Sequence, residues 1–451
     1  MRGLIIKLII IILINERCDF MRIRNLKLLT ESSLFKSAGI YTITSVINSA
    51  IPFLLLPILT RYLSPADYGI VSMFSVLISF VAPFTGLSVH GAIARMYYEK
   101  DNVDIKEYIT NALFILFSST LIVSTMFFLF SRVIADISSV PIQILWIVVV
   151  ISFSQFITKI VLTLWQVQVK PVQYGVYQIS QTALNMLLSI VLVVFVGLTW
   201  KGRIYAQLIS LTIFAGIGFF VLIRNEWLKF NLNKSYIRHA LRFGVPLIPH
   251  ALGGVIMTMT DRIFITNMVG IETTGVYTVG YQIGMIINLL ATSLNQAYIP
   301  WLYSKLKIDV TSIKRKIVKF TYAYFVIILL LAITLSLLAP PFLSFFVGKE
   351  FNQSSIYVTW IALGYAFNGM YLMVVNYIFY AQKTSYLAWV TLGSALMNII
   401  LNYVLISAYG AIGAAQATTI IYFVKFILTW ILSSKLYKMP WNISKDKIIR
   451  N

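Results

Sequence analysis

Acidic residues are scarce in this sequence, and so are cysteine and histidine. The chain has 15 Asp and Glu, a single cysteine (Cys18) and three histidines in 451 residues. One cysteine excludes an intrachain disulfide and a cysteine-based metal site, and the histidines are too scattered to suggest another. The sequence also has no glycine-rich phosphate loop ending in Gly-Lys-Ser/Thr, so it predicts no ATP site and no cofactor.

Apolar residues fill most of the chain. Hydrophobic residues make up 59% of the sequence and charged residues 11%. Stretches of about 20 mostly apolar residues recur from end to end, which is the length a helix needs to cross the hydrocarbon core of a bilayer. A soluble fold is therefore excluded. The predicted spans are 37–60, 68–90, 108–130, 142–165, 173–197, 203–223, 246–268, 276–300, 318–339, 354–380, 386–407 and 411–433.

The net charge of +21 is unevenly distributed along the chain. Of the 36 Lys and Arg, 26 fall in the N-terminal segment after residue 15, in the loops that follow even-numbered spans, and in the C-terminal tail. By the positive-inside rule, these loops and both termini are cytoplasmic. The basicity is thus a topology signal, with attraction to anionic lipid headgroups as a secondary effect, and nucleic-acid binding is not expected.

The spans and loops divide the chain into five predicted segments. Residues 1–20 contain an apolar run that is too short to span a membrane, and Met21 is an alternative start. The predicted segments are a cytoplasmic N-terminal segment (1–35), an N-terminal six-helix lobe (36–224), a cytoplasmic linker (225–242), a C-terminal six-helix lobe (243–433) and a cytoplasmic tail (434–451).

An internal repeat relates the two predicted lobes. The turn over residues 59–71, Leu-Thr-Arg-Tyr-Leu-Ser-Pro-Ala-Asp-Tyr-Gly-Ile-Val, aligns with residues 265–277 at a constant offset of 206, which matches Gly69 to Gly275. A second pair, residues 202–207 and 411–416, lies late in each lobe. Because six spans is an even number, both lobes enter from the same side, and the repeat predicts a pseudo-two-fold axis along the membrane normal. This geometry is typical of transporters, although a two-lobed channel could share it.

Polar residues at helical spacing identify the predicted interior faces. Serine and glycine positions are best explained as close helix packing. Tyrosine and asparagine stripes are better explained by a wet cavity, since aromatic rings pack on sugar C–H faces and amides bond to hydroxyls. The predicted sugar-facing residues are Tyr41, Asn48, Tyr277, Tyr281, Asn288, Asn295, Asn368 and Tyr371.

Asp261 is the only acidic residue within a predicted span. A charge at mid-membrane costs about 2.5–3.5 kcal/mol on insertion scales, so its presence calls for a reason. Consecutive helix residues point about 100° apart, so we do not expect Asp261 and Arg262 to form a simple pair. The two hypotheses are that Asp261 binds a coupling cation, H⁺ or Na⁺, or that it forms an ion pair with a base on another helix.

Basic residues and prolines complete the candidate site. Guanidinium and ammonium groups suit a diphosphate, although lysines near helix ends can also extend to the membrane surface. The candidate cationic residues are Arg61, Arg95, Lys159, Arg262 and Lys425. Prolines interrupt regular helices, and paired irregular helices at a lobe interface are candidate gates. The candidate gate residues are Pro52 and Pro57 in the first span, and Pro246 and Pro249 in the seventh.

These motifs resemble those of Wzx-type polysaccharide flippases in the multidrug/oligosaccharidyl-lipid/polysaccharide exporter superfamily. The resemblance covers residues 30–440 and rests on the turn at 59–69, on Asp261-Arg262, and on residues 398–403 and 409–418. It implies a V-shaped, MATE-like fold of two lobes around a cationic cavity. It also implies a non-enzymatic flippase that moves undecaprenyl-diphosphate-linked oligosaccharide, such as an O-antigen unit, to the periplasmic leaflet of a bacterial inner membrane. The expected partners are a polysaccharide polymerase and a chain-length regulator.

Two other functions remain open at this stage. A multidrug or lipid-II-type exporter of the same superfamily is one, although a drug exporter would have a less cationic cavity and the lipid-II type has fourteen spans. A membrane-embedded glycan polymerase or ligase is the other. The predicted outer loops carry one carboxylate each, at Asp67, Asp136, Glu272 and Glu350, which is poor material for paired acid–base catalysis.

Overall fold

The computed structural model describes residues 33–383 and 385–442, and this region consists of helices joined by short turns. Predicted residues 1–32 and 443–451 of the two terminal segments lie outside the described residues. The first half comprises α3 (Ser33–Tyr62), α4 (Pro65–Val81), α5 (His90–Tyr97), α6 (Ile105–Leu129), α7 (Ser131–Ser138), η1 (Ile142–Ile144), α8 (Leu145–Val167), α9 (Pro171–Ile190), η2 (Val191–Phe195) and α10 (Thr199–Arg224).

The second half follows a linker and has a similar helix order. It comprises α11 (Lys234–Gly244), η3 (Val245–Leu247), α12 (Ile248–Met268), α13 (Ile271–Gly284), α14 (Ile286–Leu306), α15 (Thr311–Phe346), η4 (Lys349–Ser354), α16 (Ser355–Tyr380), α17 (Ser385–Tyr409) and α18 (Ala411–Leu436).

Ten helices in the described part of the chain are long and apolar enough to cross a membrane. Many of their large apolar side chains face outward, such as Leu121 (70% exposed) and Leu337 (72% exposed). Because water would not tolerate so much exposed apolar surface, this is a multi-pass membrane protein. The other two of the twelve predicted spans, 68–90 and 276–300, fall on helices that are interrupted, α4/α5 and α13/α14.

The interruptions lie at related places in the two halves. After α4 ends, Pro83 removes a backbone donor, and Gly86, Leu87 and Ser88 take positive φ angles of 77°, 48° and 57°. The chain therefore turns over residues 82–89 before α5 begins. In the second half the interruption is the single residue Met285, between α13 and α14. The second span of each half is thus interrupted.

The proline-based expectation for the first span is wrong. Pro52 and Pro57 lie inside α3, which continues as one helix from Ser33 to Tyr62. Membrane helices tolerate internal proline because nearby groups and small backbone adjustments satisfy the freed carbonyls. In the seventh span, Pro246 lies in the 3₁₀ turn η3 and Pro249 in the first turn of α12. The gate role of all four prolines stays a prediction.

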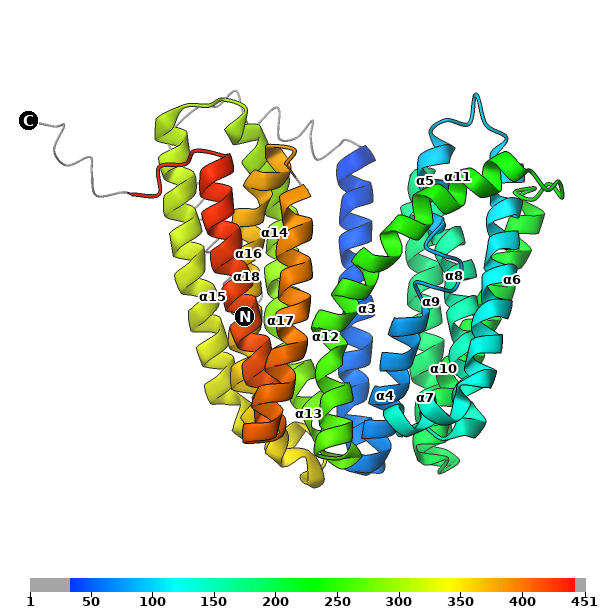
Figure 1. The fold of residues 1–451 in the computed structure, drawn as a ribbon, viewed down its shortest axis with the longest axis horizontal. Helices are drawn as coiled ribbons and strands as arrows, with labels where there is room; N and C mark the ends of the chain where they lie inside the picture. The colour runs from blue at the N-terminus through cyan, green and yellow to red at the C-terminus, as the bar shows by residue number, and fades with distance from the viewer. Residues whose placement is uncertain (1–32, 384, 443–451) are drawn as a thin grey trace, which may run out of the picture.

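The helices form two bundles that converge at one end (Figure 1). In the view of Figure 1 the bundle of α4–α10 lies on the right and that of α14–α18 on the left, with α3 and α12 between them. The bundles diverge toward the end that carries the loops 98–104, 225–233 and 307–310. We call it the basic end, because the helix ends beside these loops are rich in Lys and Arg, among them Lys234, Arg238, Arg242, Lys305 and Lys314. We call the opposite end, where α4 and α13 begin, the seam end.

At the seam end, α4 and α13 cross so closely that only glycine fits. A Cβ on Gly69 would lie 2.1 Å from the Ile271 carbonyl oxygen, and a Cβ on Gly275 would lie 2.0 Å from the Pro65 carbonyl oxygen. Each pair of equivalent residues, Gly69 with Gly275 and Pro65 with Ile271, is separated by the repeat offset of 206. The two halves therefore make the same contact in both directions, as the predicted pseudo-two-fold axis requires.

A buried hydrogen bond marks the position of this axis. The hydroxyls of Ser72 and Thr278, which are also 206 residues apart, lie 2.8 Å from each other. One turn away, Tyr68 and Gln282 are hydrogen-bonded across the same crossing at 3.1 Å. A further contact brings Gly348 against Thr60, whose hydroxyl accepts a hydrogen bond from the Gly348 backbone at 3.1 Å. We call the α4–α13 crossing the seam.

The linker between the halves is attached to the first half. The backbone N–H of Lys229 donates to Thr110, and the N–H of Asn233 donates to the Asn111 side chain, both on α6. The Asn233 amide also donates to Glu107, at 3.0 Å. These bonds hold α11 across the basic end of α5 and α6, where its Tyr236, Ile237 and Leu241 pack on the core of the first half. From there η3 and α12 cross to the seam.

Candidate functional site

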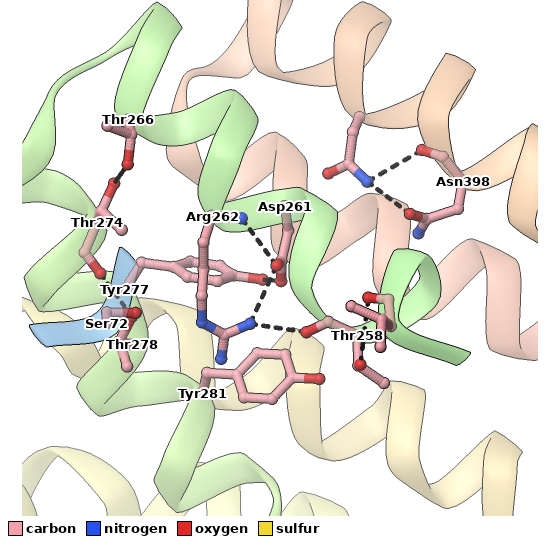
Figure 2. Close-up of polar contacts among 12 residues, drawn as sticks. Ser72, Thr258, Asp261, Arg262, Thr266, Thr274, Tyr277, Thr278, Tyr281 and Asn398 are labelled. Atoms are coloured by element: carbon pink, nitrogen blue, oxygen red, sulfur yellow. Dashed lines mark hydrogen bonds and ion pairs between the residues drawn. The ribbon is translucent and has the colours of Figure 1, made fainter. Parts of the chain in front are cut away.

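Asp261 and Arg262 lie on α12, next to the seam, and both are buried (3% and 5% exposed). Arg262 Nη1 lies 3.0 Å from Asp261 Oδ1, and the same oxygen accepts the Arg262 backbone N–H at 2.8 Å. Arg262 Nη1 also donates to the Thr258 carbonyl oxygen, one turn earlier, at 2.7 Å (Figure 2). The expectation that these neighbours do not pair is wrong, because the long Arg262 side chain folds back along its own helix.

The second oxygen of Asp261 is also occupied. Tyr277, on α13, donates its hydroxyl to Asp261 Oδ2 at 2.5 Å. The carboxylate thus receives three hydrogen bonds, from the Arg262 side chain, the Arg262 backbone N–H and the Tyr277 hydroxyl. Such a charge-assisted network offsets the desolvation of a buried ion pair, which the Coulombic attraction alone does not always do. Asp261 therefore has a basic partner, but on its own helix rather than on another.

A chain of tyrosines extends from Arg262 through the second half. The Arg262 guanidinium lies 4.2 Å from the centre of the Tyr281 ring, within cation–π range (Figure 2). The Tyr281 and Tyr365 hydroxyls are 2.6 Å apart, and the Tyr365 ring packs against that of Tyr422 with centroids 5.5 Å apart. Beyond Tyr422 lies Lys425, whose amine is 4.0 Å from the centre of the Tyr371 ring. We call Tyr281, Tyr365 and Tyr422 the tyrosine chain.

The predicted sugar-facing residues take up several different positions. Tyr277 and Tyr281 are 0% and 4% exposed, so they belong to the core of the second half and do not line an open cavity. Asn368 donates to Asn288 at 3.2 Å, and Asn376 donates to Asn295 at 2.8 Å. These two half-buried amide pairs connect α14 to α16. Tyr371 lies beneath the Lys425 amine.

Tyr41 and Asn48 connect α3 to α9 within the first half. The Tyr41 ring packs edge-on against Tyr174, with centroids 5.0 Å apart. Asn48 accepts a hydrogen bond from Thr182 at 2.7 Å and donates to the Thr44 carbonyl. Contacts of this kind are typical of polar side chains that join membrane helices. Sugar binding by any of these residues stays a prediction.

The five candidate cations divide between the ends and the interior of the molecule. Arg61 lies at the seam end and donates to the Phe345 carbonyl at 3.2 Å. Arg95 lies at the basic end, where it pairs with Glu99 at 3.6 Å. Lys159 on α8 and Lys425 on α18 lie within the membrane helices, one in each half, and neither forms an ion pair with any residue that the structure describes.

Arg203 was missed as a site residue because the charge count assigned it to an outer turn. It begins the second turn of α10, where its Nη1 donates to Asn185 at 2.6 Å and to Ser189 at 3.1 Å. Arg203 lies on α10 and Arg262 on α12, and both of these helices pack against α4 of the seam. One arginine from each half therefore flanks the seam. The signal that could have identified Arg203 is its place in the repeated segment 202–207.

The candidate site holds several cations and one buried carboxylate, that of Asp261. Among residues 33–383 and 385–442, no three His, Cys, Asp or Glu side chains gather closely enough to hold a metal ion. The buried carboxylate of Asp261 is neutralised by Arg262. What remains beside the seam is a pair of arginines, Arg203 and Arg262, that bond to neighbouring side chains, and a group of buried tyrosine hydroxyls.

Comparisons with proteins of known sequence agree with this picture. A family model described as "Polysaccharide biosynthesis protein" matches residues 34–307. An uncharacterized membrane protein of Haemophilus influenzae is 26% identical over 395 residues, which covers 86% of this chain and 92% of that protein. The Lsg locus putative protein 1 of the same species is 25% identical over 402 residues, covering 86% and 97%. The capsular polysaccharide biosynthesis protein CapF of Staphylococcus aureus is 22% identical over 424 residues, covering 90% and 100%.

Solved structures share the fold at low sequence identity. An inward-facing multidrug resistance MATE family transporter of the MOP superfamily has a TM-score of 0.70 and 13% identity, covering 88% of this chain and 94% of the other. The lipid II flippase MurJ in an inward closed conformation has a TM-score of 0.67 and 16% identity, covering 90% and 87%. An outward-facing multidrug resistance MATE family transporter has a lower TM-score of 0.56 and 17% identity, covering 89% of this chain and 95% of the other. The predicted two-lobed, MATE-like membrane fold is confirmed.

The family model spans more than half of the chain and both sides of the seam, including α4, α12 and α13. The alignments with the Lsg locus putative protein 1 and with CapF cover 97% and 100% of those proteins. The chain belongs to the polysaccharide biosynthesis protein family.

Proposed function

We propose that this protein is a flippase for a polyprenyl-diphosphate-linked oligosaccharide. It moves the saccharide and its diphosphate from the cytoplasmic to the periplasmic leaflet of a bacterial inner membrane by alternating access. Two features support this proposal: membership of a polysaccharide biosynthesis family, and two bundles that meet at the seam end and diverge at the basic end. By the positive-inside rule the basic end is cytoplasmic, so the halves diverge toward the leaflet in which the substrate is made.

The observation that carries the proposal is the pair of unpaired lysines. Because Arg262 neutralises Asp261, Lys159 and Lys425 are left without a carboxylate among the described residues. Each lies well inside its helix, 8 and 11 residues before the helix ends at Val167 and Leu436. At 1.5 Å per residue these depths are roughly 12 and 16 Å.

An unpaired charge at such a depth is costly. An embedded lysine costs about 2.5–3.5 kcal/mol on insertion scales. The cation–π contact of Lys425 with Tyr371 returns about 0.5–2 kcal/mol, which leaves most of that cost uncompensated. A diphosphate that bridges the two halves would supply the missing negative charge. Binding at this level would draw the bundles together at the basic end, which is the movement that alternating access requires.

Ion coupling, by H⁺ or Na⁺, is a further part of the proposal. A proton or Na⁺ that binds Asp261 competes with Arg262 for the same carboxylate, so it would release the guanidinium beside the seam. Replacing Asp261 with Asn removes the titratable group but keeps its shape. Transport by Asp261→Asn that retains the full ion dependence of the unmodified protein would eliminate this role. The polymerase and chain-length regulator are proposed as partners that consume the flipped product.

The test measures transport directly. Purified full-length protein is reconstituted into vesicles that contain a fluorescent polyprenyl-diphosphate-linked saccharide, and its appearance in the outer leaflet is followed by a membrane-impermeant quencher. We expect Lys159→Gln and Lys425→Gln each to slow transport by about tenfold or more, corresponding to at least about 1.4 kcal/mol. Lys425→Arg should restore a large part of the rate because it keeps the charge.

Lys201 provides a matched control. This lysine is exposed and lies over the Trp200 ring at 5.6 Å, so Lys201→Gln removes a cation–π lysine without changing the interior. Transport by Lys201→Gln should match that of the unmodified protein. Failure of the unmodified protein to move the saccharide, together with expulsion of organic cations from the same vesicles, would overturn the flippase and identify a multidrug exporter.

A further inference from the structure

An apolar groove runs along the first half, between α4 and α6. It has a volume of about 600 Å³, within the range of about 300–1,000 Å³ that is typical of ligand sites. Its walls come from α4, the turn after α4, α6, α7 and α11. They include Phe80, Phe84, Phe114, Ile122, Phe127 and Leu241. The polar side chains in the lining are two serines, Ser118 and Ser119, and Ser119 already bonds to the Gly86 backbone.

The groove follows the thickness of the membrane. On α6 it extends from Phe114 to Phe127, which at 1.5 Å per residue is roughly 20 Å. It starts beneath α11 near the basic end and reaches Ile134 of α7 near the seam end. A hydrocarbon core is about 30 Å thick, so the groove spans most of one crossing. Its shape and lining fit a single long hydrocarbon chain.

Helix α11 gives the groove a basic rim. Ile237 and Leu241 face into the groove, while Lys234, Arg238 and Arg242, which are spaced four residues apart, are exposed. None of these three bases forms an ion pair with a residue that the structure describes. The bonds from the linker to α6 fix this helix in place. An apolar helix face beside a row of cations is the arrangement that binds a lipid with an anionic head.

We infer that this groove holds the polyprenyl chain of the substrate, with its diphosphate at Arg238 and Arg242 before the saccharide enters between the halves. The inference rests on the proposed function. A single chain is favoured over a two-chain phospholipid because the neighbouring groove beside α6, where a second chain would lie, has a more polar lining and no basic rim. That groove, of about 580 Å³, lies between α6 and α8, includes Thr120, Ser124 and Gln143, and has no residue of α11 in its lining.

Two serines of α6, Ser118 and Ser124, allow a matched test. Ser118 faces the inferred chain groove and Ser124 the neighbouring groove, so Ser118→Trp and Ser124→Trp place the same bulk in each. The probe is a polyprenyl diphosphate without saccharide that carries a diazirine on its chain, photolysed with the full-length protein in vesicles. Two further probes carry the same diazirine on an uncharged polyprenol and on a phosphatidylglycerol acyl chain. Crosslinked peptides are located by mass spectrometry.

We expect the diphosphate probe to label the α4 and α6 peptides of the groove. Ser118→Trp should lower this labelling about tenfold or more, whereas Ser124→Trp should change it by less than about twofold. Arg238→Gln with Arg242→Gln should weaken labelling by the diphosphate but not by the polyprenol. Lys305→Gln with Lys307→Gln, at the basic end of the other half, is the control and should leave labelling unchanged.

Several results would overturn the inference. Labelling spread evenly to lipid-facing α15, or insensitivity to Ser118→Trp, would show that the chain does not occupy the groove. Equal labelling by phosphatidylglycerol, with competition by excess unlabelled phosphatidylglycerol, would assign the groove to a membrane phospholipid. Transport measured in the same vesicles separates the two proposals. Transport without groove labelling removes this subsite only, and groove labelling without transport removes the flippase only.

Discussion

The two halves of this protein are nearly equivalent at the seam and very different inside. At the seam, Gly69 and Gly275 make the same close contact from opposite directions, and Ser72 bonds to its own counterpart Thr278. Inside the second half lie a buried ion pair and the tyrosine chain. At the same offset of 206 residues, the first half has Leu55 and Leu56 in place of Asp261 and Arg262. Those leucines are 4% and 1% exposed and belong to an apolar core.

The difference separates contacts that symmetry explains from features that only one half has. Contacts that repeat in both halves can be explained by symmetry, because one set of side chains serves both directions of the crossing. Features present in one half need another explanation, since the other half folds without them. The ion pair, the tyrosine chain and Lys425 in the second half, and the apolar groove in the first, are of this second kind.

The largest effect is expected from splitting the ion pair. Asp261→Leu leaves the Arg262 charge buried without its carboxylate, which should destabilise the protein by about 3–5 kcal/mol. The double variant Asp261→Leu with Arg262→Leu copies the first half at these positions. Its stability should return close to that of the unmodified protein, because apolar residues of suitable size often replace buried pairs without loss.

Thermal unfolding in detergent and transport in vesicles distinguish the two roles of the pair. A stable double variant that does not transport would show that the pair serves the ligand rather than the fold. A stable double variant with full transport would instead show that the second half needs the pair no more than the first half does.

The next largest effect is expected from the seam glycines. A Cβ at Gly275 would come within 2.0 Å of a carbonyl oxygen, and one at Gly69 within 2.1 Å, so the helices must move apart in either variant. Gly69→Ala and Gly275→Ala should each cost about 1–3 kcal/mol, the range for overpacking. If the halves are equivalent at the seam, the two changes should lower the unfolding temperature by similar amounts.

Control variants for the seam come from open helical glycines. A Cβ at Gly216 or Gly254 meets no atom within 4 Å. Alanine at either position should stabilise its helix by about 0.5–1 kcal/mol, because glycine is the weaker helix former. A seam variant as stable as these controls would contradict the close crossing.

A smaller contrast involves two asparagines that lie at corresponding places in the halves. In the first half, Asn185 accepts a hydrogen bond from the Arg203 guanidinium at 2.6 Å. In the second half, Asn398 accepts one from the neutral Asn402 amide at 3.1 Å. Asn185→Ala should destabilise by about 1.5–3 kcal/mol because it removes a hydrogen bond from a charged donor, and Asn398→Ala by about 0.5–1.5 kcal/mol because the bond it removes is neutral. If thermal unfolding shows equal losses of stability in the two variants, the charged bond from Arg203 stabilises the protein no more than the neutral bond from Asn402.

Sequence patterns predicted the repeat and its pseudo-two-fold axis, because the residues that repeat are distinctive locally. The glycine and the threonine of the repeated turn are small or polar in an otherwise apolar chain, so their recurrence at a fixed offset is visible in the sequence. The capping box of Ser64 and Asp67 at the start of α4 has no counterpart at the start of α13, whose N-cap is Gly270. Pro83 predicts an irregularity in the second span, whereas nothing in the sequence predicts the interruption of the eighth span at Met285. The positive φ angles at Gly86, Leu87 and Ser88 leave no clear signature in so apolar a segment.

The interior could not be predicted in the same way. A polar stripe shows that a helix face avoids lipid, but not which neighbour covers it, so Tyr281 was placed in a cavity and lies instead under Arg262. The Asp261–Arg262 contact depends on how one flexible side chain folds back, which helical spacing does not determine. The apolar groove gave no signal, because its lining residues are of the same types as those that face lipid.

The smallest effect concerns the acid that precedes the third membrane helix of each half. Asp104 caps α6 and forms an ion pair with Lys229 of the linker at 2.8 Å. Asp309 instead forms an ion pair with Lys314, in the first turn of the α15 helix that follows it. The hydrogen bond from Lys229 lowers the pKa of Asp104 below its usual value, and the same bond raises the pKa of Lys229. A lowered carboxyl pKa means that the stabilisation is present above the unfolded value, about 3.9, and is lost as the pH falls through the folded value. A raised pKa of the Lys229 amine means that the stabilisation is also lost as the pH rises through the folded value of this amine.

Linker order should therefore be constant between these limits and fall slightly on the acid side. Hydrogen exchange of residues 226–233, corrected for the intrinsic chemical rate, would measure this. Asp104→Asn should raise exchange there at neutral pH and remove the acid dependence, and high salt should have a similar but weaker effect because both groups are largely exposed. Asp309→Asn should leave this segment unchanged, since its bond to Lys314 stays within the second half. An equal response to both substitutions would contradict the view that the linker is attached to the first half alone.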